Sequence, residues 1–97
     1  MKIWAKCIKE NKIVSDVVQE FALARPSDIE GWNAVLTDIC RELDLGRPIV
    51  LNKHLQHWNT FQRADFFPDD FMEEVSFDKF SVEILPEPKK KRRMMEL

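Results

Sequence analysis

One apolar stripe between residues 29 and 43 constrains the fold of this chain more than any other feature. Polar side chains fill the opposite face, and Gly46 and Pro48 end the pattern. The stripe recurs at the 3.6-residue period of a helix, at Ile29, Trp32, Val35, Leu36, Ile39, Cys40 and Leu43. It predicts a helix whose apolar face packs on another layer. The polar face is acidic and has no lysine, which disfavours a dimer seam or a membrane-surface helix.

The residues before the stripe predict where this helix begins. Ser27-Asp28-Ile29-Glu30 fits a capping box. In that motif the Ser27 hydroxyl accepts a hydrogen bond from a first-turn amide, and Glu30 reaches back to the cap amide. We therefore expect Ser27 to be the N-cap of the helix.

Two runs with strand character precede the helix. In residues 2–9, Ile3, Ala5 and Cys7 alternate with larger or charged side chains, and residues 12–21 are rich in β-branched residues. The segment between them contains Asn11, which tolerates the positive φ of a tight turn. The sequence predicts a β-hairpin whose small, apolar face lies under a helix.

The second half of the chain predicts a helix, a short turn and one more strand. Asn52 is the expected cap of a helix over residues 53–63, and Pro68 suits the first position of a single helical turn over residues 68–71. Residues 79–85 alternate between Phe80, Val82, Ile84 and their neighbours, which is typical of a strand. Pro86 then ends this strand.

These elements predict an α+β fold of ββααβ order. Its three-stranded, mainly antiparallel sheet is covered on one face by helices, and the last strand lies beside the first in the order 2-1-3. At 97 residues the chain is one domain. We expect residues 1–85 to form a single compact domain, and residues 86–97 to form a basic, disordered tail.

The composition offers little support for catalysis. His54 and His57 are the only histidines, and a zinc site needs three or four ligands. The two glycines form no phosphate-binding loop, and no serine lies in a nucleophile elbow. Cys7 and Cys40 fit buried thiols in a reducing compartment. We therefore expect no catalytic residue, no metal and no cofactor, and hence no enzyme.

Residues 53–85 contain the candidate binding surface. Six of the seven phenylalanines lie there, and residues 65–78 carry six acidic residues without a base. An exposed aromatic cluster beside this acidic run would mark a contact site for a protein partner. The alternative is a solvated loop whose acids cap a helical turn. The candidate residues are His54, Phe61, Asp65, Phe66, Phe67, Asp69, Asp70, Phe71, Glu73 and Glu74.

The basic tail suggests an alternative function. Residues 1–85 carry 15 acidic and 10 basic side chains, which argues against a broad nucleic-acid surface on the folded body. The candidate phosphate-contacting residues all lie in the tail, at Lys89, Lys90, Lys91, Arg92 and Arg93. Nucleic acid could therefore bind through the tail only. A solubilising terminus is the other interpretation.

Several short motifs resemble a group of short, uncharacterised proteins from Firmicutes-type bacteria. The motifs are Met1-Lys2-Ile3-Trp4-Ala5, residues 26–43, Lys53-His54, Phe61, Phe66, Asp69-Asp70-Phe71 and Val75-x-Phe77-Asp78. The resemblance covers residues 1–85 and implies a bacterial origin and one compact domain. It implies no activity, ligand or catalytic residue.

The sequence therefore predicts a small, non-enzymatic protein-binding domain with an accessory or regulatory role. Lysines interrupt the apolar N-terminal residues and no long apolar run exists, so we expect a cytoplasmic protein without a membrane partner. A homodimer that extends its sheet through the exposed hairpin edge is a further expectation.

Overall fold

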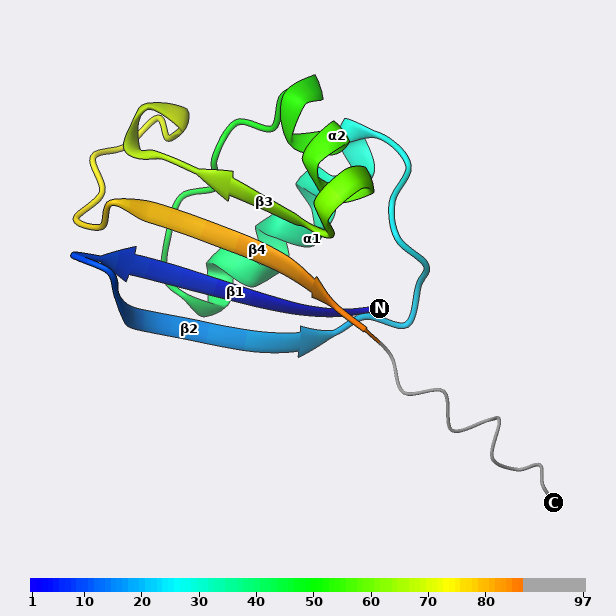
Figure 1. Ribbon diagram of the computed structural model, residues 1–97, viewed down its shortest axis with the longest axis horizontal. Helices are drawn as coiled ribbons and strands as arrows, with labels where there is room; N and C mark the ends of the chain where they lie inside the picture. The colour runs from blue at the N-terminus through cyan, green and yellow to red at the C-terminus, as the bar shows by residue number, and fades with distance from the viewer. Residues whose placement is uncertain (87–97) are drawn as a thin grey trace, which may run out of the picture.

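The computed structural model describes residues 1–86, which form a four-stranded antiparallel sheet with two helices on one face (Figure 1). The strand order is β2-β1-β4-β3. The elements in chain order are β1 (Lys2–Lys9), β2 (Lys12–Glu20), α1 (Ile29–Glu42), α2 (Asn52–Phe61), β3 (Arg63–Phe66), a 3-10 turn (Pro68–Asp70) and β4 (Lys79–Leu85).

The predicted α+β class is confirmed, and so is the position of the last strand beside the first. The predicted number of three strands is wrong, because β3 pairs with the outer side of β4. The sequence places Arg63 at the end of the predicted helix and predicts no regular element for residues 64–67. Gln62 adopts a left-handed conformation with φ 62°, which ends α2 two residues early and reverses the chain directly into β3.

The hairpin forms as its sequence predicts. Glu10 and Asn11 both have positive φ, 52° and 65°, as the two central residues of a tight hairpin turn require. The alternation in β1 buries Ile3, Ala5 and Cys7 against the helical layer.

Both helices begin at a different cap from the predicted one. Asp28, not Ser27, is the N-cap of α1, and its Oδ1 accepts a 2.9 Å hydrogen bond from the amide of Gly31. Leu51, not Asn52, is the N-cap of α2, and its amide donates a 2.9 Å hydrogen bond to Nδ1 of His54. The side chain of His54, the third residue of α2, therefore accepts the hydrogen bond from the N-cap amide.

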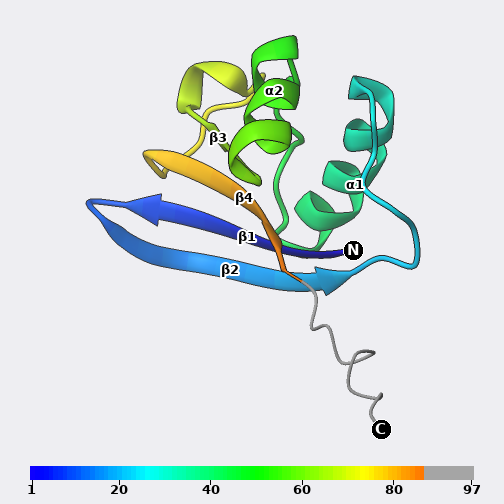
Figure 2. The same ribbon diagram turned by 45° about the vertical axis from the view of Figure 1, so that its right-hand side comes forward.

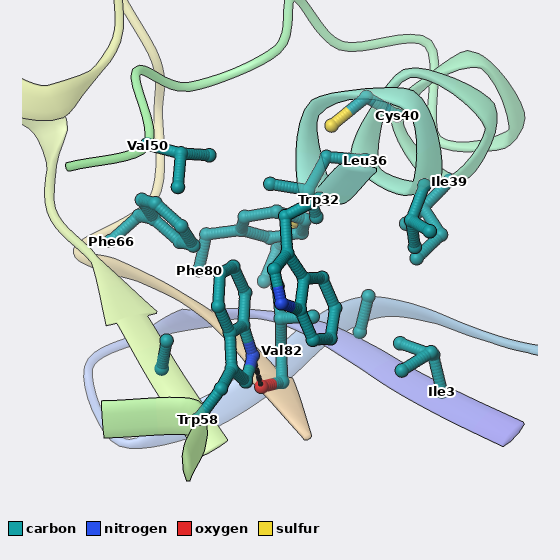
Figure 3. Packing of buried hydrophobic residues seen from close by; sticks show 14 of the residues in the cluster. Ile3, Trp32, Leu36, Ile39, Cys40, Val50, Trp58, Phe66, Phe80 and Val82 are labelled. Carbon is teal, nitrogen blue, oxygen red and sulfur yellow. Dashed lines mark hydrogen bonds between the residues drawn. The ribbon is translucent and has the colours of Figure 1, made fainter. Parts of the chain in front are cut away.

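The core joins both helices to the inner strands (Figure 3). Trp32 of α1 and Trp58 of α2 stack at 3.7 Å between ring centroids, and Trp58 Nε1 donates a 3.1 Å hydrogen bond to the carbonyl of Val82. Around this pair lie buried side chains of all layers, including Ile3, Leu36, Ile39, Phe66 and Phe80. The apolar stripe of α1 is thus part of the core, as predicted.

The opposite face of the sheet is open among the described residues (Figure 2). Side chains of β1, β2 and β4 form polar contacts with one another on this open face. Lys6 Nζ lies 3.1 Å from Glu83 Oε1 and 4.0 Å from the ring centroid of Trp4, whose Nε1 donates a hydrogen bond to Asp16. Neither helix in residues 1–86 is long and apolar enough to cross a membrane.

Candidate protein-binding surface

Three of the ten predicted binding residues are buried. His54 and Phe66 are 1% and 0% exposed and stack on each other at 4.1 Å between centroids. Phe71 is 8% exposed and packs edge-on against Phe77 and Phe80. The expected cluster of four exposed phenylalanines is therefore wrong for Phe66 and Phe71, because strand alternation and the 3-10 turn direct both rings into the core.

His54 has a structural environment rather than a substrate-facing one. Its Nδ1 accepts the hydrogen bond from the Leu51 amide, which leaves Nε2 to carry the proton in the neutral ring. Nε2 lies 3.8 Å from Asp70 Oδ2 and has no hydrogen-bond partner among the described residues. Burial lowers the pKa of His54, and the nearby Asp70 carboxylate opposes that effect.

The acidic run divides into acids with local structural contacts and acids that face solvent. Asp70 Oδ2 accepts a 2.9 Å hydrogen bond from the Phe67 amide and so caps the 3-10 turn. Asp78 Oδ2 accepts a 2.8 Å hydrogen bond from the Glu10 amide at the hairpin turn. Asp65 lies 3.6 Å from Arg63 Nε and 4.0 Å from Lys79 Nζ. The exposed acids of the predicted set are Asp69, Glu73 and Glu74.

The remaining two candidate phenylalanines line a depression of about 290 Å³ at the end of α2. Phe61 is 66% exposed and Phe67 is 50% exposed. His57, one helical turn before Phe61, and two side chains of β3 complete the lining, so that the residues are His57, Phe61, Arg63, Asp65 and Phe67. We call this set the α2–β3 surface. Phe61, Asp65 and Phe67 are among the binding residues that the sequence predicts, whereas His57 and Arg63 are not.

The two missed residues follow from spacings that the sequence contains. His57 and Phe61 are four residues apart, which places them on one helical face, and their rings lie 5.9 Å apart. Arg63 and Asp65 share one parity, which places them on one face of β3, and Phe67 follows directly after the strand. Only recognition of β3 as a strand would have brought Arg63 into the set.

The α2–β3 surface lies along an unpaired sheet edge. β3 is an outer strand, and the Ile84 amide donates a 2.8 Å hydrogen bond to the Gln62 carbonyl. Because hydrogen-bonded pairs alternate along an antiparallel ladder, Ala64 and Phe66 also bond to β4. By the same alternation, the N–H and C=O groups of Arg63 and Asp65 point away from β4, toward the open side of β3.

The cysteines do not contribute to this surface. Cys7 and Cys40 are buried, free thiols, and burial raises the pKa of both, that of Cys40 to about 12. Thiols of this kind are poor nucleophiles because the thiolate is the reactive form. Among residues 1–86, no group of three or more His, Cys, Asp or Glu side chains is arranged to hold a metal ion.

The predicted phosphate-contacting residues Lys89, Lys90, Lys91, Arg92 and Arg93 lie outside the described residues. Comparisons with protein-family models, curated proteins and solved structures found no significant match to this chain.

Proposed function

We propose that this chain is a non-catalytic protein-binding domain with an accessory or regulatory role, and that it binds its partner through the α2–β3 surface. One observation carries the proposal. Two large aromatic side chains, Phe61 and Phe67, are half or more exposed and line one depression beside the outer strand β3. Exposed aromatic rings gathered at one place are typical of contact sites, where their burial supplies much of the binding free energy.

The backbone beside these rings supports a specific mode of binding. The outward N–H and C=O groups of Arg63 and Asp65 offer hydrogen bonds to an extended segment, as sheet edges do in strand addition. Phe61 and Phe67 would then contact side chains of that segment on either side of it. The charges of Arg63 and Asp65 would favour a segment with the opposite order of charges.

The environment of the most reactive side chains supports a binding role over a catalytic one. The ring of His54 is buried. Its Nδ1 accepts a hydrogen bond from the Leu51 amide, and its Nε2 faces the Asp70 carboxylate. Both thiols are buried with raised pKa values. The accessible groups of the α2–β3 surface are the rings of Phe61, Phe67 and His57 and the ion-paired Arg63 and Asp65, a mixture that suits recognition of a protein surface.

Site-specific photo-crosslinking tests this proposal. A photoreactive phenylalanine analogue is placed at Phe61 or, as a matched control, at Leu23, which is 53% exposed and lies outside the α2–β3 surface. The full chain is then irradiated in cells that naturally produce it. We expect a discrete adduct from position 61 and none from position 23. Equal labelling from both positions, or no adduct from position 61, would contradict the proposal.

A further inference from the structure

Arg63 and Asp65, the two outward residues of β3, carry opposite charges. Two copies of this strand placed antiparallel can therefore pair each charge with its opposite. We propose that the α2–β3 surface binds a second copy of this chain, with β3 pairing antiparallel to its counterpart about a two-fold axis at Ala64. The result is one continuous eight-stranded sheet. This inference rests on the proposed function and names the occupant of the same site.

The available backbone groups limit the length of the new ladder. Gln62 is excluded because its amide donates to the Trp58 carbonyl and its carbonyl accepts from Ile84. Phe67 is excluded because its amide donates to Asp70 Oδ2 and its carbonyl accepts from the Asp70 amide. Arg63 and Asp65 thus supply all outward groups of the strand, two donors and two acceptors in each copy.

Only one antiparallel register uses all of these groups. In one alternative register, Arg63 lies opposite Arg63 of the second copy, and in another, Asp65 lies opposite Asp65. Each of these registers places like charges opposite each other. Each also leaves the backbone of the other outward residue, Asp65 or Arg63, without a hydrogen-bond partner. Pairing Arg63 with Asp65 of the second copy, in both directions about the axis, forms four backbone hydrogen bonds. The axis then passes through Ala64, and each charge faces its opposite.

The same register places the new strand pair beside two exposed aromatic rings. Phe67 directly follows the last residue of β3, and Phe61 precedes its first residue by two positions. Both helices α2 lie on the same side of the joined sheet, because a two-fold axis perpendicular to the sheet preserves its faces. The interface would therefore form next to the exposed rings of Phe61 and Phe67.

The other sheet edge lacks this complementarity. The amide of Phe21 donates to the Met1 carbonyl, so the alternation in the β1–β2 ladder directs the backbone of Asp16, Val18 and Glu20 outward. These three residues include two acids and no base. A register irregularity between Cys7 and Ile8 also interrupts this edge. We therefore assign the homodimer to β3 instead of the hairpin edge.

A charge exchange tests the register. The full chain is studied by sedimentation velocity over a concentration series, with the variants Arg63→Asp, Asp65→Arg and the double variant, and circular dichroism verifies folding. We expect a reversible dimer whose dissociation constant rises at least about tenfold in either single variant, because both cross-axis pairs become like-charged. The double variant, and an equimolar mixture of the two single variants, should both recover the dimer, since each pairs opposite charges again.

Lys12→Asp on the hairpin is the matched control, with the same change of charge on an exposed residue. It should leave the dimer unchanged. The inference is overturned if the wild-type chain stays monomeric at its highest soluble concentration, if Arg63→Asp has no effect, or if the mixed single variants remain monomeric. A monomer that still forms an adduct with a different protein from position 61 would refute the homodimer alone. No adduct of either kind would refute the proposed function as well.

Discussion

The indole rings of Trp32 and Trp58 lie face to face, with 3.7 Å between their centroids and 8° between their planes. Both side chains are 0% exposed, and each comes from a different helix. The hydrogen bond from Trp58 to the Val82 carbonyl fixes the stacked pair to β4. This contact holds α2 in place beside β3 and so positions the α2–β3 surface.

Truncation of Trp58 should therefore weaken the whole fold. We expect Trp58→Ala to lower the free energy of unfolding by about 3–5 kcal/mol, because it removes a large buried ring and leaves a cavity. Trp58→Phe keeps an aromatic ring but loses the hydrogen bond to Val82, and should cost about 1–3 kcal/mol. Urea denaturation measures both changes. A loss below about 1 kcal/mol for Trp58→Ala would contradict the anchoring role.

The buried His54 should make stability depend on pH. Its pKa is lowered by burial in the folded chain, so below the ordinary value of 6.5 the unfolded chain binds a proton more readily. The free energy of unfolding should therefore be highest above pH 6.5 and fall as the pH drops below it. The slope for one proton is at most about 1.4 kcal/mol per pH unit.

Two variants separate this effect from other titrations. His54→Gln should remove the loss of stability between pH 7 and pH 5, whereas His57→Gln on the exposed face of α2 should retain it. Thermal or urea unfolding at each pH gives the comparison. If the free energy of unfolding falls with pH equally in the wild-type chain and in His54→Gln, another titrating group causes the loss of stability.

The cap of α1 can be assigned by two substitutions in adjacent residues. Asp28→Ala removes the acceptor of the Gly31 amide and should destabilise the chain by about 0.5–2 kcal/mol. Ser27→Ala should change stability by less than about 0.5 kcal/mol, because Ser27 is exposed and the helix is already capped. If urea titrations show a larger loss of stability for Ser27→Ala than for Asp28→Ala, Ser27 and not Asp28 caps the helix.

Binding of nucleic acid through the tail remains a separate prediction. If Lys89, Lys90, Lys91, Arg92 and Arg93 contact phosphates, the full chain should retard nucleic acid in a gel, with a steep decrease as salt increases. Deletion of residues 88–97 should abolish that shift. Absence of any shift for the full chain at low salt would exclude this alternative.

The regular elements could be predicted because their periodicity is long enough to be distinctive. Helix α1 is fourteen residues long, and the alternating strands β1 and β4 are eight and seven residues long. β3 has only four residues and follows α2 after a single left-handed residue, so neither period is visible there. Since a strand of this length is defined by its pairing with β4, its sequence alone does not identify it.

The binding surface could be predicted only in part for the same reason. Composition pointed to the phenylalanines between residues 61 and 71, but the parity of β3 decides which of them are exposed. Phe66 faces the core, whereas Phe67 continues past the end of the strand and remains half exposed. Likewise, the role of Asp70 depends on a turn that brings its carboxylate to the Phe67 amide and toward His54.

Amide hydrogen exchange across residues 61–67 tests the central claim most directly. In the isolated chain at low concentration, the outward amides of Arg63 and Asp65 should exchange rapidly. In the assembled state, whether the dimer at high concentration or a complex recovered from cells, both amides should become protected. The outward amides of β2, at Asp16 and Val18, should exchange equally in both states. Protection confined to β2, or none within residues 61–67, would contradict the assignment of the binding surface to α2 and β3.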